Sequence, residues 1–212
     1  MSPRQVQKTR GKRGLMIAEP VEQVETVEVI RHRFTVAEFL RMAEVGLLAE
    51  DGRVELLWGD IVKMSPINVP HALCVNRLTM LLATKLAERT IVSVQNPIQL
   101  DEYALPQPDI ALWKPTPNEY RDRLAWPTEV LLVVEVADSS IRHDRKAKTK
   151  LYGAAGIVDY WIVNLQARQI EIYREPRPNG YRTVTYYTPG EKLSPLAFPE
   201  IQIDAVEILG AE

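Results

Sequence analysis

Residues 131–136, Leu-Leu-Val-Val-Glu-Val, form an apolar run that contains a single carboxylate, Glu135. A short apolar run bounded by turn signals is typical of a buried strand. A carboxylate in such a strand loses its hydration on folding, which costs several kcal/mol unless a cation, a hydrogen-bond network or a proton compensates. Glu135 is therefore predicted to belong to a polar site.

A second apolar run, residues 108–113, carries an acid at its opposite end. Asp109 opens this run, whereas Glu135 lies near the C-terminal end of the other run. Antiparallel pairing of the two strands would bring both carboxylates to one end of the sheet. Oxygen ligands of this kind suit Mg²⁺ or Mn²⁺, so the pair predicts a hydrolytic metal site. Taken alone, Asp109 beside Pro108 also fits an ordinary turn residue.

The segment from Asp144 to Ala155 reads as a helix that stops at Gly156, the residue type expected just past a helix end. Asp144, Lys148 and Tyr152 are spaced four apart and are predicted to share one face of that helix. The face would bring an ammonium group to the two carboxylates. An exposed Asp–Lys pair, with the tyrosine packing on the sheet, explains the same spacing and is favoured for Lys148 alone. Taken together, the three groups favour a site.

Three further side chains are candidates for supporting roles. Glu55 is either a third acid at the same sheet end or a surface residue, and the surface is slightly favoured. His71, near the start of a long helix, could shuttle a proton, although a histidine at that position is more often structural or exposed. Gln107, two residues before Asp109, could donate a hydrogen bond to a water or a phosphate.

Periodicity, capping and turn signals predict the remaining elements. They are a short helix opening with a capping box at Thr35–Glu38, a hairpin over residues 53–64, a helix over 70–89, a loop over 115–127, and strands over 91–100, 159–165, 169–174 and 181–187. This order of elements indicates an α/β or α+β fold, with a mixed sheet flanked by helices.

Length and composition indicate one ordinary globular domain. The chain has 212 residues, of which 46% are hydrophobic and 25% charged, and its net charge is -2, which argues against a histone-like coating of nucleic acid. Cys74 is the single cysteine, so an intramolecular disulfide is excluded and a cytoplasmic location is expected. Residues 1–30 are predicted to be a mobile tail before a domain at 31–212. Its basic start could touch a phosphate backbone, but a solvated leader is favoured. No membrane association is expected.

Several of these motifs together resemble a known family, described as putative restriction endonucleases and placed in the PD-(D/E)XK nuclease superfamily. The matching segments are residues 107–110, residues 132–140, Asp144-Arg145 with Lys148 and Tyr152, residues 156–163, and the N-terminal pattern of residues 55–62 and 64–66 with His71. The resemblance extends over residues 33–208. It implies a restriction-endonuclease-like mixed β-sheet core flanked by helices, with an extra N-terminal helix and hairpin.

The resemblance also implies roles for individual residues. Asp109 and Glu135 would be the Mg²⁺ ligands, and the backbone carbonyl of Val136 would complete the shell. The superfamily pattern Glu-x-Lys would require lysine at position 137, where this chain has alanine. Lys148 is the position that matches the catalytic lysine in this family. It would orient the attacking water or stabilise the transition state, while Asp144 fixes Lys148 and Tyr152 supports both.

The function implied is that of a DNA endonuclease that requires Mg²⁺ or Mn²⁺ and no organic cofactor. A homodimer is expected by analogy with restriction enzymes that read palindromes. Basic residues that flank the site are expected to contact DNA phosphates without reading sequence; they are Arg121, Arg123, Arg142, Arg145, Lys146 and Lys150. The rival interpretation is a catalytically inactive nuclease-fold module that binds DNA or a protein partner, and the displaced lysine keeps it open.

Overall fold

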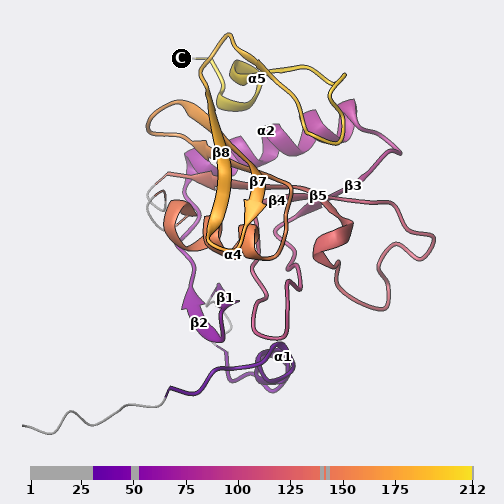
Figure 1. Cartoon of the computed structure of the whole chain (residues 1–212), viewed down its shortest axis with the longest axis vertical. Helices are drawn as coiled ribbons and strands as arrows, with labels where there is room; N and C mark the ends of the chain where they lie inside the picture. Colours follow the sequence, from indigo (N-terminus) through magenta and orange to yellow (C-terminus); the bar gives the residue numbers. More distant parts are fainter. Residues whose placement is uncertain (1–30, 49–52, 139–140, 142–143, 212) are drawn as a thin grey trace, which may run out of the picture. The chain divides into compact units, whose positions relative to one another are not determined.

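The computed structural model describes residues 31–48, 53–138, 141 and 144–211, and the predicted tail at residues 1–30 lies outside them. From His32 onward the chain forms one unit (Figure 1). Its helices are α1 (Val36–Glu44), α2 (Val69–Lys85), the short η1 (Pro127–Glu129) and η2 (Asp144–Lys148), α4 (Thr149–Ala154) and α5 (Ala205–Leu209). Its strands are β1 (Val54–Leu57), β2 (Asp60–Lys63), β3 (Ile91–Val94), β4 (Ile110–Trp113), β5 (Val130–Ala137), β6 (Asp159–Asn164), β7 (Gln169–Arg177), β8 (Gly180–Tyr187), β9 (Lys192–Leu193) and β10 (Ile203–Asp204). Among these described elements, no helix has both the length and the apolar character needed to cross a bilayer.

The central sheet has the strand order β3-β4-β5-β6-β7-β8. β5 and β6 run parallel, whereas the neighbouring pairs on either side of them are antiparallel. A parallel pair needs a crossover connection, and the segment that contains η2 and α4 supplies it. The predicted fold class, a mixed sheet flanked by helices with an extra N-terminal helix and hairpin, is confirmed.

Both faces of this sheet are covered, which explains why β4 and β5 are apolar at nearly every position. On one face Leu112 and Val134 belong to the core that α2 and α5 complete, and Figure 1 shows these two helices side by side. On the other face Val133 packs in the same cluster as Leu151 of α4. Because strand side chains alternate, Glu135 shares the face of Val133 and points toward α4.

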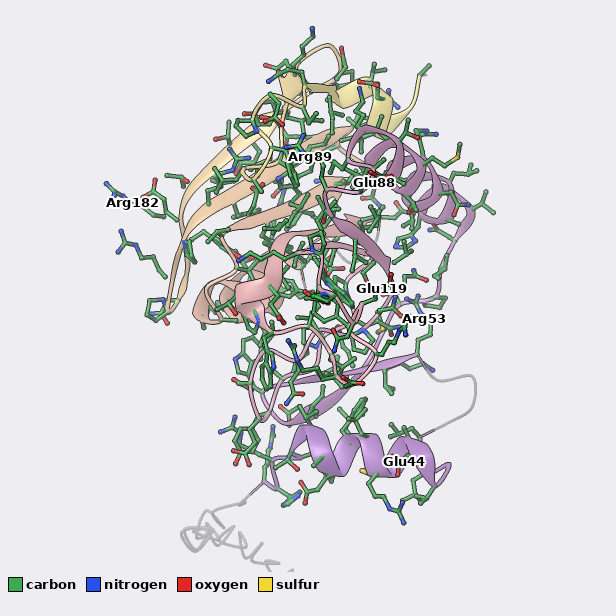
Figure 2. The ribbon with its side chains drawn as sticks, turned by 90° about the vertical axis from the view of Figure 1, so that its right-hand side faces the viewer. Glu44, Arg53, Glu88, Arg89, Glu119 and Arg182 are labelled. Carbon is green, nitrogen blue, oxygen red and sulfur yellow. The ribbon has the colours of Figure 1, made fainter. Side chains whose placement is uncertain are left out.

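The N-terminal helix and hairpin form as the sequence predicts. Thr35 caps α1, and its hydroxyl accepts a hydrogen bond from the Glu38 amide while the Glu38 carboxylate accepts one from Thr35. β1 and β2 pair antiparallel. Leu56 of β1 also bridges to Leu105, and this contact ties the hairpin to the segment that leads into β4. Figure 2 labels Glu44, the last residue of α1.

Two elements end earlier than predicted. α2 stops at Lys85 rather than Arg89, because Leu86 leaves helical geometry at φ -118° and Glu88 takes a positive φ of 62°. β3 stops at Val94 rather than Leu100, because Gln95 takes a φ of 51° and turns the chain out of the strand. Apolar residues continue to recur at the same spacing beyond the end of α2 and the end of β3, so this spacing alone predicts elements that are too long.

The helix predicted from Asp144 begins with the π-helical turn η2 before it becomes the α-helix α4. A π turn is wider than an α turn and is found mostly as a single turn, often at functional sites. The predicted helix is present, and its first turn, over residues 144–148, is π-helical rather than α-helical. Gly156, with a φ of 79°, follows the C-terminus of α4 as predicted.

A close approach between two glycines sets the position of α4 on the sheet. A Cβ atom added to Gly153 would lie 2.1 Å from the carbonyl oxygen of Gly180, at the start of β8. This oxygen belongs to the backbone and cannot rotate away. A side chain at position 153 would therefore push α4, together with Lys148 and Tyr152, away from β8.

We expect Gly153→Ala to lower the free energy of unfolding by about 1 to 3 kcal/mol, the usual cost of overpacking. Urea denaturation followed by circular dichroism measures the change. Lys150→Ala is the matched control, since Lys150 lies in the same helix and is exposed. Equal stability of the two variants would show that α4 can shift without cost.

Candidate active site

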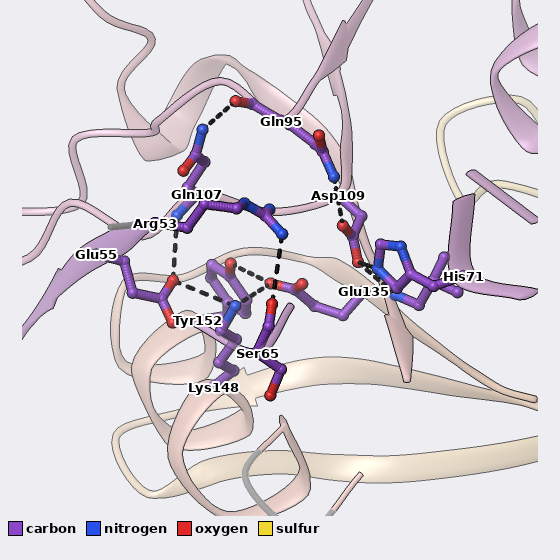
Figure 3. A network of polar contacts seen from close by, with 11 residues as sticks. Arg53, Glu55, Ser65, His71, Gln95, Gln107, Asp109, Glu135, Lys148 and Tyr152 are labelled. Atoms are coloured by element: carbon purple, nitrogen blue, oxygen red, sulfur yellow. Dashed lines mark hydrogen bonds and ion pairs between the residues drawn. The ribbon is translucent and has the colours of Figure 1, made fainter. Parts of the chain in front are cut away.

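A pocket of about 370 Å³, called here the central pocket, is lined by residues from β1, β2, α2, β5 and η2 and by Asp109 (Figure 3). The register of β4 and β5 pairs Ile110 with Val134, so Asp109 and Glu135 stand opposite each other one position further along. The prediction that antiparallel pairing brings both acids to one sheet end is confirmed. The exposed fractions of Asp109 and Glu135 are 5% and 4%.

Asp109 is held by three donors. One oxygen, Oδ2, lies 3.0 Å from Nε2 of His71 and accepts a hydrogen bond of 2.9 Å from the backbone amide of Val136. The other, Oδ1, accepts one of 3.2 Å from Gln95. Burial alone would raise the pKa of Asp109, but these donors lower it below its ordinary value. Asp109 is thus a fixed carboxylate anion.

Glu135 meets two side chains from the segment that follows it. Lys148 Nζ lies 2.9 Å from Oε1 of Glu135, and the hydroxyl of Tyr152 donates a hydrogen bond of 2.8 Å to the same oxygen. Lys148 is only 4% exposed and Tyr152 is fully buried. The exposed-pair interpretation of Lys148 is therefore wrong, and the predicted convergence of two carboxylates and one ammonium group is what the structure contains.

Glu55 is the third acid at this sheet end. Its Oε2 lies 3.2 Å from Lys148 Nζ and accepts a hydrogen bond of 3.3 Å from the backbone amide of Gln107. Glu55 is 3% exposed, so the preference for a surface position was wrong. The reason is the docking of the hairpin, which buries the Glu55 face of β1 against η2. Lys148 is consequently held between Glu55 and Glu135.

The other supporting candidates have different outcomes. His71 contacts Asp109 and is mostly buried, which contradicts the exposed alternative and leaves a structural role or a proton shuttle as predictions. Gln107 was expected to reach a water or a phosphate, but its side-chain amide donates to the backbone carbonyl of Gln95 instead. Asp144 is buried and lines the central pocket.

The protonation of the buried pair follows from its surroundings. Burial raises the pKa of Glu135 to about 8, against the effect of Lys148 and with a further rise from the other carboxylates. Burial alone would lower the pKa of Lys148, but Glu135, Glu55 and Asp144 raise it above its ordinary value. Lys148 therefore stays charged, and Glu135 is the member of the pair whose charge depends on what else enters the pocket.

The charges of the central pocket fit a divalent cation. Among the described residues five carboxylates line it against three cationic side chains, which leaves an excess of two negative charges when Glu135 is ionised, as it would be beside a cation. No group of three acidic, histidine or cysteine side chains in this described part is already arranged as a ligand set. Two strand-end carboxylates with water and backbone oxygens suit Mg²⁺, which keeps several waters and uses one or two carboxylates. Asp109 and Glu135, with the proposed carbonyl of Val136, are the residues that would hold it.

The basic residues predicted to contact DNA that the structure describes do not line the central pocket. Arg145 is engaged by the buried Glu171 through a forked ion pair. Lys146 and Lys150 are exposed, and Arg142 lies outside the described residues. DNA contact by this group stays a prediction.

Arg123, predicted to lie near the site, instead forms a forked ion pair with Glu129 of η1. This hydrogen-bonded pair lowers the pKa of Glu129 from 4.5 to about 2. Because the folded-state pKa is lowered, the stabilising contribution is complete above about pH 4.5 and is lost as the pH falls toward 2. We expect the melting temperatures of wild type and Glu129→Gln to converge across that range. A difference in melting temperature that stays constant with pH would show that Glu129 does not contribute to the loss of stability in acid.

Two parts of the site were missed by reasoning from the sequence. Gln95 directly follows β3, and the register that pairs Val94 with Ile110 puts it opposite Asp109. The end of an apolar run followed by an amide was the signal that could have found it. Asn68 caps α2 and donates a hydrogen bond of 2.6 Å to Asp138, and both line the central pocket.

Comparison with known proteins identifies a family and a structural relative. The family Uma2, described as putative restriction endonuclease, matches residues 36–206. A crystal structure of a putative nuclease of the family DUF820 from Anabaena variabilis is similar at a TM-score of 0.62 and 13% sequence identity, over 83% of this chain and 97% of that one. At that identity the likeness shows a shared fold. A comparison with curated proteins gives no match.

Proposed function

The chain belongs to the Uma2 family of putative restriction endonucleases, and on that premise we propose that it is a metal-dependent endonuclease that hydrolyses phosphodiester bonds of DNA. The observation that carries the proposal is the position of Lys148. Its ammonium group lies 2.9 Å from Glu135 and 3.2 Å from Glu55, in a pocket that also contains Asp109.

The geometry supports Lys148 as the lysine that replaces the one missing from the linear motif. The superfamily pattern Glu-x-Lys is interrupted here by Ala137, which is fully buried on the Val133 face of β5. Lys148 reaches the Glu135 carboxylate from the next element instead. The departure from the linear motif thus leaves the ammonium beside the carboxylate, where the chemistry requires it.

Each residue has a physical task in the proposed reaction. When bound, a divalent cation would acidify the attacking water and neutralise charge that builds up on the phosphate. Asp109 would hold the cation from a fixed position, because His71, Gln95 and the Val136 amide restrain both of its oxygens. Lys148 would orient the water and stabilise the additional negative charge of the transition state.

The remaining polar groups keep Lys148 in place. Glu55 fixes the ammonium from the hairpin side, and Tyr152 fixes the Glu135 oxygen that Lys148 contacts. Asp144 favours the charged lysine through the electrostatic field. These are positioning residues, since their contacts are with other protein groups.

A cleavage panel tests the proposal. Supercoiled plasmid, linear duplex, branched DNA and single strands are incubated with the protein and Mg²⁺ or Mn²⁺, with EDTA as the control. Metal-dependent nicking or cutting of at least one form is the expected result. No cleavage of any form would favour the non-catalytic module that binds DNA or a protein.

Metal binding can be measured apart from cleavage. We expect isothermal titration calorimetry to detect Mg²⁺ or Mn²⁺ binding to the wild type and not to Asp109→Ala, because that substitution removes a carboxylate whose lowered pKa keeps it ionised as a metal ligand. Asp122→Ala is the control, since Asp122 is an exposed acid that the central pocket does not include. Equal, negligible heats for wild type and Asp109→Ala would contradict the metal site.

A homodimer is proposed by analogy with enzymes that cut both strands of a palindrome, where a two-fold axis would present one pocket to each strand. Sedimentation velocity measures the mass in solution.

A further inference from the structure

Arg53 lines the central pocket and takes no part in the proposed reaction. It directly precedes β1, and its carbonyl accepts a hydrogen bond of 2.8 Å from the Met64 amide, which continues the hairpin by one pair. Side chains two residues apart in an extended strand share a face. Arg53 therefore lies on the same side of the hairpin as Glu55, whose carboxylate contacts Lys148.

Among the described residues, the guanidinium of Arg53 has little to bind. Its one hydrogen bond to this part of the chain goes to the carbonyl of Ser65 at 3.5 Å, the long end of the range, and Figure 3 shows the side chain reaching toward that residue. Within the described segments Arg53 has no carboxylate partner, although five carboxylates line the same pocket. By contrast, seven described arginines form ion pairs; they are Arg41, Arg89, Arg121, Arg123, Arg145, Arg174 and Arg182.

Lys148, the buried cation among the described residues that line the pocket, already has two partners. Lys148 is almost fully buried between two carboxylates, so it has limited freedom to bring a substrate in. A guanidinium with most of its five donors free matches the oxygens of a phosphate in pairs. We propose that Arg53 binds a backbone phosphate of the nucleic acid in the central pocket, an inference that rests on the proposed function for its substrate.

Arg53 takes the role of phosphate contact that the sequence assigns to Arg145. Arg145, which the sequence predicts to contact a phosphate, has its guanidinium engaged by Glu171. Arg53, directly before β1, lines the central pocket. A single phosphodiester with its adjoining sugars suits a space of about 370 Å³, and a whole duplex does not. Arg53 would thus act on the strand segment that enters the pocket.

The test compares Arg53→Gln with Arg182→Gln. Arg182 is an exposed arginine of β8, and Figure 2 shows it on the opposite side of the view from Arg53. Fluorescence anisotropy measures the binding of labelled single-stranded and duplex DNA in Ca²⁺ buffer, over about 50 to 200 mM salt. We expect Arg53→Gln to weaken binding roughly tenfold and to reduce the slope of log K against log salt by about 1, the mark of one lost phosphate contact. Arg182→Gln should bind like the wild type.

Each outcome decides the proposal. Identical binding and slope for the two variants would overturn it. Weaker binding with an unchanged slope and a lowered melting temperature would assign Arg53 to hairpin stability and would also overturn the proposal. Failure of the wild type to bind either single-stranded or duplex DNA would overturn it as well. Cleavage by the wild type with Mg²⁺ is scored separately. DNA binding that depends on Arg53, without cleavage, would support the phosphate contact and contradict the endonuclease. Cleavage by Arg53→Gln with an unchanged KM would support the endonuclease and contradict the phosphate contact.

Discussion

Replacing Glu135 by glutamine is expected to abolish DNA cleavage while leaving the fold intact. The amide keeps the shape of the side chain and an oxygen that accepts from Tyr152 and Lys148, whose distances to Oε1 are 2.8 and 2.9 Å. It removes the negative charge that a divalent cation needs as one of its ligands at this sheet end. The loss should therefore appear in turnover, because the contacts that hold Lys148 and Tyr152 in place survive.

Stability provides the check on this variant. Burial raises the pKa of Glu135 to about 8, so the metal-free side chain takes up a proton readily, and an amide resembles the protonated form. Urea denaturation of the metal-free protein should give nearly equal midpoints for wild type and Glu135→Gln. Glu119→Gln, at an exposed acid labelled in Figure 2, is the matched control for cleavage. Nicking at the wild-type rate by folded Glu135→Gln would remove Glu135 from the chemistry.

The sheet end and its two acids could be predicted from the sequence because the information is local. An apolar run fixes a buried strand, and the place of the acid within the run fixes the end at which it lies. Antiparallel pairing of neighbouring strands then brings Asp109 and Glu135 together, as the register of β4 and β5 shows. The capping box of α1 and the glycine after α4 are local signals of the same kind.

The rest of the site depends on packing between distant segments, which local patterns do not encode. Glu55 looks like one acid of an exposed hairpin, and its burial follows from a contact with Lys148, 93 residues further along. Arg145 looks like a free cation until β7 brings Glu171 beside it. The π turn over residues 144–148 was hidden because the sequence around it has ordinary helical spacing.

Replacing Lys148 is expected to affect both turnover and stability. Its ammonium stands between two buried carboxylates, and removing one partner of a buried ion pair costs about 3 to 5 kcal/mol, since the remaining charges lose their compensation. The loss of a group that orients water and stabilises developing charge should lower turnover by roughly 10² to 10⁴. Lys148→Ala should show both effects.

A second variant separates chemistry from folding. Lys148→Met keeps most of the apolar stem in the buried space and removes only the charge, so it should fold even if Lys148→Ala does not. Circular dichroism and urea denaturation establish the folded state, and single-turnover cleavage gives the rate. Lys192→Ala, at an exposed lysine of β9, controls for the loss of a positive charge elsewhere. Because Lys148 is the described ammonium group that contacts Glu135, a wild-type rate in folded Lys148→Met would mean that this ion pair serves only to hold η2 against the sheet.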